Sequence, residues 1–203
     1  MRSGERGEGK PLTLWVLTGN EGKLREFKSL GESLGVRVER AIAPKLEIQS
    51  EELTSIAALS AVLAKAASSI PTPAFVEDAG LFIRALKGFP GPYSSYVLKT
   101  LGVKGVLKLM EGVEDRAAYF KSAIALILPD GSVKVFTGIV NGSITLEARG
   151  EGGFGFDPIF MPEGFSMTFA EMSTDLKNRI SHRGKAFREM VSWLRTAFKT
   201  RLP

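Results

Sequence analysis

A hairpin in the middle of the chain restricts the fold more than any other feature of the sequence. Residues 117–128 form a long, mostly apolar run that is compatible with a central β-strand. Pro129-Asp130-Gly131 predicts a turn, and residues 132–140 predict the returning strand. Nearer the N-terminus, predicted strands alternate with predicted helices, which is typical of βα crossovers. The sequence therefore predicts an α/β fold with a mixed central β-sheet that is flanked by helices.

Length and composition indicate one domain. The chain has 203 residues, of which 44% are hydrophobic and 24% are charged. Residues 1–12 are rich in Gly, Arg and Glu and predict a flexible N-terminal tail, whereas residues 13–203 predict a single α/β domain. Because no apolar run approaches the ~20 residues that span a bilayer, we expect no membrane partner.

Residue usage also excludes several kinds of site. The chain has no cysteine, which excludes disulfides, thiolate metal sites and cysteine nucleophiles, and which fits a reducing cytoplasm. It has one histidine, which excludes a histidine-cluster metal site. The net charge of +5 favours anionic ligands such as nucleotides, but it is too small to indicate nucleic-acid binding.

Two adjacent carboxylates, Glu77 and Asp78, follow the short apolar run 74–76, and Gly80 comes two residues later. If residues 74–76 form a strand, its end delivers both charges to one place. The pair is either a solvated acidic corner or a site where a metal ion or a proton separates the two charges. Glu47, which lies between two apolar residues, is either an outward-facing residue at a strand edge or the second carboxylate of a metal site.

The first predicted strand, residues 14–17, leads through a glycine-containing turn into a helix with one apolar face. The turn is Thr18-Gly19-Asn20-Glu21-Gly22-Lys23. An anion can rest on the backbone N–H groups where such a helix begins, although a plain βα turn has the same pattern. Further on, Ser50 predicts the start of an alanine-rich helix, on which Lys65 is nearly the only charge. Lys65 alone is typical of a surface lysine whose stem lies along apolar neighbours.

A glycine-rich segment, residues 149–160, carries Phe154, Gly155, Phe156 and Asp157. Glycines let the backbone approach a ligand closely, and an exposed Phe offers a flat face to a nucleobase. The alternative is a glycine-rich hairpin with core aromatics.

Basic residues gather near the C-terminus. Lys177 lies on a short helix, and His182 and Arg183 lie where Ser181 predicts the start of the last helix. A histidine beside an arginine suits contact with an anion or a purine, although an exposed histidine without a role has the same pattern. Together with the carboxylates and the glycine turn, these residues indicate a Mg-dependent enzyme acting on a nucleotide or a phosphate.

The motifs, taken in order, resemble the inosine triphosphate pyrophosphatase (Ham1-like) family. The matching motifs are Thr18-Gly19-Asn20-x-x-Lys23, Glu77-Asp78-x-Gly80-Leu81, Gly88-x-Pro90-Gly91-x-Tyr93-Ser94, Gly155-x-Asp157-Pro158-x-Phe160, Thr168-Phe169-Ala170-Glu171-Met172, Lys177-Asn178 and Ser181-His182-Arg183. They run from about residue 13 to the end of the chain. Each motif is short, but the whole series in this order is highly specific.

The resemblance implies hydrolysis of ITP, dITP and XTP to the nucleoside monophosphate and pyrophosphate, with Mg2+ as cofactor. It also implies an elongated mixed sheet flanked by helices, in an ITPase-like, anticodon-binding-like architecture with two lobes and the active-site cleft between them. A homodimer in the cytoplasm is implied as well. Two other functions stay open: a pyrophosphatase for other modified nucleotides, and a non-catalytic nucleotide- or RNA-binding module.

The resemblance also assigns roles to individual residues. Asp78 is expected to be the general base and a metal ligand, Glu47 the other metal ligand, and Glu77 a further carboxylate of the metal site. The expected substrate-binding residues are Thr18, Gly19, Asn20, Glu21, Gly22, Lys23 and Lys65 at the phosphates, Ala79 beside the base catalyst, Phe154, Gly155, Phe156 and Asp157 at the base and sugar, and Lys177, His182 and Arg183 in the purine pocket. Many relatives have Ser or Thr in place of Ala79, and Tyr or Trp in place of Phe156, so two polar contacts are absent here.

Overall fold

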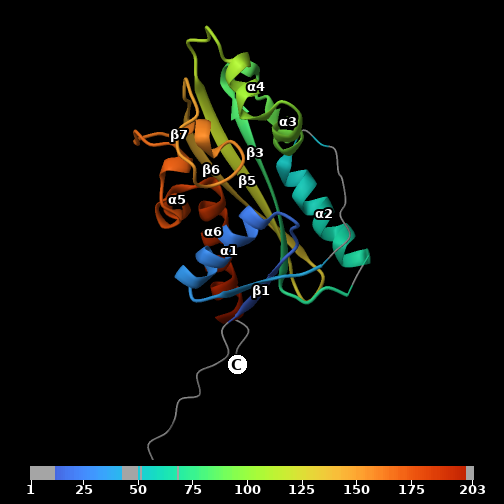
Figure 1. Ribbon diagram of the computed structural model, residues 1–203. Coiled ribbons are helices and arrows are strands. Elements are labelled where there is room, and N and C mark those ends of the chain that lie inside the picture. The colour runs from blue at the N-terminus through green and yellow to red at the C-terminus, as the bar shows by residue number, and fades with distance from the viewer. Residues whose placement is uncertain (1–11, 43–49, 51, 68, 200–203) are drawn as a thin grey trace, which may run out of the picture.

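The computed structural model describes residues 12–42, 50, 52–67 and 69–199, and Figure 1 shows how their helices surround one central sheet. The strands are β1 Thr13–Val16, β2 Arg37–Arg40, β3 Ala74–Ile83, β4 Pro90–Gly91, β5 Ala117–Ile127, β6 Val133–Ile144 and β7 Phe160–Pro162. The α-helices are α1 Glu21–Ser33, α2 Leu53–Ala67, α3 Ser94–Thr100, α4 Gly102–Leu109, α5 Thr174–Ile180 and α6 His182–Lys199. Short 3-10 helices cover Arg84–Leu86, Asp157–Ile159 and Phe169–Glu171. No helix in this part of the chain is long and apolar enough to cross a membrane.

The sheet is mixed, as the sequence predicts. Its strands follow the order β2-β1-β3-β5-β6-β7, and β4 pairs with β3. The pairs β1–β2 and β1–β3 are parallel, whereas β5 runs antiparallel to both β3 and β6. The predicted hairpin is confirmed, since Ile127 of β5 lies opposite Val133 of β6.

One edge of β3 is open in its middle. Strand β1 pairs with β3 at Ala74 and Phe75, and β4 pairs with it at Leu81 and Phe82. Among the described residues, no strand therefore neighbours residues 76–80 on that edge. Here the Lys23 ammonium donates to the Glu77 carbonyl over 3.1 Å. This gap in strand pairing lies beside the acidic pair, where the family resemblance implies the active-site cleft, while β3 stays paired with β5 on its other edge.

The position of the acidic pair within β3 differs from the prediction. Glu77 and Asp78 lie in the middle of a ten-residue strand and not at the end of a short one. Successive side chains of a strand point to opposite faces, so the two carboxylates are separated by the sheet. The apolar run ends at residue 76, where the charged pair begins, while pairing with β5 continues through Ile83.

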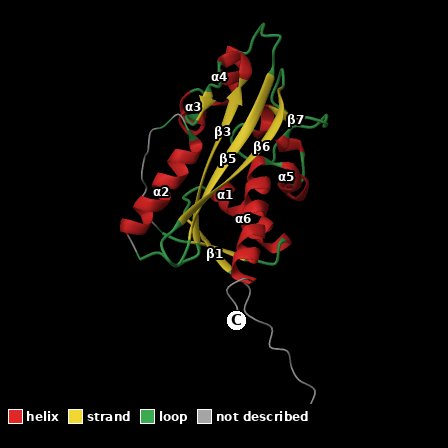
Figure 2. Ribbon diagram, turned by 180° about the vertical axis from the view of Figure 1, so that it is seen from behind, coloured by secondary structure: helices red, strands yellow, loops and turns green. Residues whose placement is uncertain are grey.

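Helices cover both faces of the sheet (Figures 1 and 2). Helices α1 and α6 bury one face in a core that includes Phe27, Phe75 and Phe187. Helix α2 buries the opposite face with small residues such as Ala57 and Ala61. A third apolar cluster lies at the far end of the sheet, beneath α3 and α4. The sheet thus has an apolar core on each face and a third core at its far end.

Candidate functional site

The first turn of α1 begins at the open edge. Asn20 is the N-cap, and its side-chain oxygen accepts a hydrogen bond from the Lys23 backbone N–H over 3.0 Å. The hydroxyl of Thr18 accepts one from the Asn20 backbone N–H over 3.1 Å. Gly19 is exposed, and Glu21 forms a surface ion pair of 2.6 Å with Arg40. The predicted βα turn is confirmed, and the helix that follows it begins beside the open edge of β3, where Lys23 contacts Glu77.

Glu77 is buried among cations on the face that α1 and α6 cover. Its carboxylate lies 2.9 Å from the Lys23 ammonium and 3.2 Å from the guanidinium of Arg183, and it accepts a 2.7 Å hydrogen bond from the Ser122 hydroxyl. Burial alone would raise the pKa of Glu77, but Arg183 and Lys23 outweigh it and lower the pKa from 4.5 to about 2. Glu77 is therefore a permanent anion that holds two cations in place.

The pKa of Asp78 is shifted in the opposite direction to that of Glu77. It is largely buried, and burial raises its pKa above the ordinary value, although Lys23 works against this rise. One of its oxygens accepts a hydrogen bond of 3.0 Å from the neighbouring Ala79 N–H. A carboxylate with a raised pKa is a better proton acceptor than an ordinary aspartate, which suits a general base.

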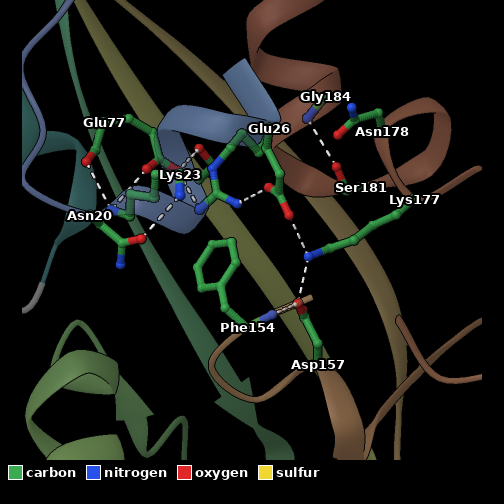
Figure 3. A network of polar contacts seen from close by, with 12 residues as sticks. Asn20, Lys23, Glu26, Glu77, Phe154, Asp157, Lys177, Asn178, Ser181 and Gly184 are labelled. Atoms are coloured by element: carbon green, nitrogen blue, oxygen red, sulfur yellow. Dashed lines mark hydrogen bonds and ion pairs between the residues drawn. The ribbon is translucent and has the colours of Figure 1, made fainter. Parts of the chain in front are cut away.

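Glu26 joins Lys177, Arg183 and Asp157 into one polar network, part of which Figure 3 shows. Its carboxylate accepts from the ammonium of Lys177 over 2.5 Å and also from the guanidinium of Arg183. Lys177 donates in addition to Asp157 over 2.5 Å. Burial would raise the pKa of Glu26, but the ion pairs with Arg183 and Lys177 outweigh this effect and lower it. Our sequence analysis missed Glu26, although a carboxylate beside Phe27 on the buried side of α1 was a detectable signal.

The ring of Phe154 lies beside this network. It is half-buried, with its centroid 4.9 Å from the Lys177 ammonium and 5.3 Å from the guanidinium carbon of Arg183. A Cβ atom at Gly22 would lie 2.5 Å from the ring, so only glycine allows the first turn of α1 to approach it. Asp157 accepts from the Phe154 backbone N–H over 2.6 Å and thereby fixes the loop, within which Gly155 has a φ of +69°. Burial raises the pKa of Asp157.

Phe156 does not lie in the cleft. It is buried in the apolar cluster at the far end of the sheet, together with Ile159 and Phe160. The expectation that it contacts the base is therefore not matched, because alternate residues of this loop point into the core. The glycine-rich segment combines both interpretations of its sequence, with Phe154 at the site and Phe156 in the core.

His182 is buried, and this excludes the interpretation as an exposed histidine. Its ring stacks on Phe120 with the centroids 4.7 Å apart and an interplanar angle of 11°. Burial and the neighbouring Arg183 lower its pKa well below the usual value, so the imidazole is neutral at pH 7. The predicted helix start is confirmed, since the Ser181 hydroxyl accepts from the Gly184 N–H over 3.1 Å. Nδ1 of His182 and Nε of Arg183 are buried without a hydrogen-bond partner among the described residues.

Two further predicted site residues are Glu47 and Lys65. Glu47 lies outside the described residues. Lys65 lies in the last turn of α2, the end of the helix that leads into the start of β3. Strand β3 begins at Ala74. Asp78 lies four residues further along this strand, which at the usual rise per residue is about 13 Å from its start.

A metal site would depend on Asp78. The described residues contain no group of three or more acidic or histidine side chains that could hold a metal ion. Glu77 does not fit as a ligand, because its carboxylate is engaged by Lys23, Arg183 and Ser122 on the other face of the sheet. Asp78 fits, since its only hydrogen bond within the described chain uses one oxygen and it lies at the open edge. Its oxygen chemistry is the kind that Mg2+ prefers.

Comparisons with known proteins agree with this geometry. The family model of the Ham1 family matches residues 14–193. The dITP/XTP pyrophosphatase of Hyperthermus butylicus is 56% identical over 180 residues, which cover 89% of this chain and 93% of that protein. The dITP/XTP pyrophosphatase of Thermococcus kodakarensis is 50% identical over 188 residues, which cover 93% of this chain and 100% of that protein.

Solved structures give the same result. The Ham1 protein of Staphylococcus aureus superposes with a TM-score of 0.75 at 29% identity, and a HAM1 protein from Coxiella burnetii with a TM-score of 0.77 at 30% identity. Each covers 91% of this chain and 99% of the solved chain. With the family model spanning nearly the whole domain, the chain belongs to the Ham1 family.

Proposed function

We propose that this protein hydrolyses noncanonical purine nucleoside triphosphates (ITP, dITP and XTP) to the nucleoside monophosphate and pyrophosphate. The proposal rests on the arrangement at the open edge of β3, where the two faces of the sheet carry different chemical groups. A carboxylate suited to accept a proton lies on one face, and a rigid set of hydrogen-bond donors beside an aromatic ring lies on the other. The names of the Hyperthermus and Thermococcus relatives support the same substrates.

Base selection follows from the donors in the purine pocket. Hypoxanthine and xanthine present a 6-oxo acceptor where adenine presents an amino donor. The unpartnered Nε–H of Arg183 is a buried donor, and the charge of Lys177 is close to the same ring, Phe154. A 6-oxo group satisfies such a donor, whereas an amino group leaves it unpaired at a cost of about 1–3 kcal/mol.

The reaction needs a water that loses a proton. The water oxygen attacks the α-phosphorus, the proton passes to Asp78, and the bond from the α-phosphorus to the bridging oxygen breaks. The leaving pyrophosphate takes the bonding electron pair. Lys23 and the backbone N–H groups that begin α1 hold the phosphates at the open edge.

Mg2+ is part of the proposal. Asp78 and Glu47 would hold it, and when bound it would neutralise charge on the phosphates. Glu77 would act differently from our expectation, because it orients Lys23 and Arg183 and does not bind the metal. A homodimer and a cytoplasmic location, which the family resemblance implies, stay predictions.

A substrate panel with product identification tests the proposal. Purified protein is incubated with Mg2+ and ITP, dITP, XTP, ATP or GTP, and the products are separated by chromatography. We expect monophosphate and pyrophosphate from the first three, and about fivefold to 150-fold slower turnover of ATP, from the ~1–3 kcal/mol penalty of an unpaired group. Diphosphate plus phosphate, or equal turnover of ATP and ITP, would exclude it. Binding without turnover indicates the non-catalytic nucleotide-binding module instead.

Asp78→Asn tests the base. We expect kcat to fall by about 100-fold to 10,000-fold, the usual contribution of a general base, while ITP still binds. The matched control is Asp175→Asn, in the first turn of α5 and exposed, whose kcat should equal that of the unmodified protein. Retained activity in Asp78→Asn would remove Asp78 as the base.

A further inference from the structure

Three buried or half-buried cations on the face that α1 and α6 cover are already paired with protein carboxylates. Lys23 pairs with Glu77, Lys177 pairs with Glu26 and Asp157, and Arg183 pairs with Glu26 and Glu77. This buried network contains as many carboxylates as cations, so it carries no net charge for the phosphates. A nucleoside triphosphate brings several negative charges, and cleavage adds negative charge to the leaving pyrophosphate. Positive charge is therefore needed elsewhere, on the face where Asp78 lies.

The register of the sheet places one lysine there. Asp78 lies opposite Ala123, and Gly80 lies opposite Lys121. Residues opposite each other in antiparallel strands share a face, as do residues two apart on one strand. Lys121 is therefore on the same face as Asp78, as its diagonal neighbour. Diagonal neighbours are about 7–8 Å apart at the backbone, within the reach of a lysine side chain.

The ammonium group of Lys121 is also unpaired among the described residues. It is half-buried in the sheet, and within the described residues it makes no ion pair or side-chain hydrogen bond. Its neighbour Gly80 has no side chain, and the carbonyl oxygen of Gly91 lies on this face, 2.3 Å from where a Cβ atom at Gly80 would be. Two other cations near this face are less suitable: Lys65 lies at the end of α2 that leads into the start of β3, and Arg84 is paired with Asp115 on the surface.

We infer that Lys121 binds the pyrophosphate leaving group, an inference that rests on the proposed function. Water attack and departure occur on opposite sides of the phosphorus, so a group that assists departure should be near the base catalyst without touching it. A diagonal neighbour of Asp78 satisfies this condition. Water adds to the α-phosphorus and gives its proton to Asp78. The bridging oxygen leaves with its electron pair as part of pyrophosphate, and the ammonium of Lys121 stays protonated throughout.

Product inhibition separates this role from a structural one. Initial rates of ITP hydrolysis are measured for Lys121→Met, Lys121→Arg and the unmodified protein with added pyrophosphate or added IMP. Losing one hydrogen bond to a charged group should raise the inhibition constant of pyrophosphate by about tenfold or more in Lys121→Met. The constant for IMP should stay within twofold, and Lys121→Arg should recover most of the pyrophosphate affinity. Lys104→Met, at an exposed position on α4, removes the same charge as a control.

Each outcome decides the inference. Equal pyrophosphate inhibition in Lys121→Met and Lys104→Met would overturn it, and so would an equal weakening of pyrophosphate and IMP, which indicates a general distortion. The proposed function is tested separately by the substrate panel, and one way in which it fails is that the unmodified protein releases no pyrophosphate from ITP. In that case calorimetric titration with magnesium pyrophosphate still compares the variants, and unchanged affinity in Lys121→Met again overturns the inference.

Discussion

Replacing Glu77 by glutamine should destabilise the protein in a strongly pH-dependent way. The carboxylate is fully buried between Lys23 and Arg183, and its pKa is about 2 against 4.5 for an ordinary glutamate. A pKa that is lowered in the folded state stabilises that state above the unfolded pKa, and the effect is lost as the pH falls toward the folded pKa. Glutamine has the shape of a protonated glutamate, so the variant shows what remains when the charge is gone.

The pKa difference sets the magnitude. Each pKa unit corresponds to about 1.4 kcal/mol, so the shift of Glu77 from 4.5 to about 2 amounts to about 3 kcal/mol at pH 7. Glu77→Gln should therefore be about 3 kcal/mol less stable than the unmodified protein at pH 7. This difference should shrink as the pH falls from 4.5 toward 2 and vanish near pH 2. The titrations of groups that do not interact with Glu77 are common to both proteins and cancel in the comparison, whereas Asp78 and His182 lose the pKa-raising effect of its charge.

Urea unfolding at 25 °C, followed by circular dichroism between pH 2 and pH 7, measures the difference directly. Glu111→Gln is the control, because Glu111 pairs with Lys108 where both side chains are mostly exposed, and such pairs contribute about 0–1 kcal/mol. Ser122→Ala is a milder second variant, since it removes only the 2.7 Å hydrogen bond to Glu77 and should cost about 1–2 kcal/mol. A difference below ~1 kcal/mol for Glu77→Gln at pH 7, or one that does not change with pH, would refute the reasoning.

Three further substitutions test other parts of the site. Asp78→Asn should leave the urea midpoint at pH 7 unchanged or raise it, because burial raises the pKa of Asp78 and its ionisation opposes folding; a lower midpoint would contradict this. Gly22→Ala should raise the KM for ITP several-fold with little loss of stability, because its Cβ would lie 2.5 Å from the Phe154 ring; an unchanged KM would show that the ring position does not matter. Gly138→Ala should destabilise by about 1–3 kcal/mol in urea unfolding, because its Cβ would lie 2.1 Å from the His182 carbonyl oxygen; unchanged stability would mean that α6 can shift away from β6.

The sequence predicted the elements of the fold well where local chemistry decides them. The hairpin of β5 and β6 follows from a long apolar run and a Pro-Asp-Gly turn, and both are found. Ser173 and Ser181 cap the helices that they precede. The gap in strand pairing along β3 could not be predicted in this way. It depends on β1 and β4 pairing with different ends of β3, which is decided by packing between segments far apart in the sequence.

The site was only partly predictable for the same reason. Lys177, His182 and Arg183 were recognised as a group, but the carboxylate that holds two of them, Glu26, is about 150 residues away in the chain. Phe156 was assigned to the cleft because its loop matches a family motif. Its burial depends on which residues of the loop face the apolar cluster under α4. This is decided by tertiary packing and not by the local sequence.

The acidic pair shows how one step along a strand creates two chemically different carboxylates. Both Glu77 and Asp78 are largely buried, and burial raises the pKa of each. Only Glu77 faces Arg183 directly, so only its pKa falls to about 2, where it cannot accept a proton at neutral pH. Asp78 lies across the sheet from that arginine, keeps its raised pKa, and stays able to act as a base. Exchanging the faces by a one-residue slip of β3 would place the base among the cations, so the chemistry depends on the register of this strand against β5.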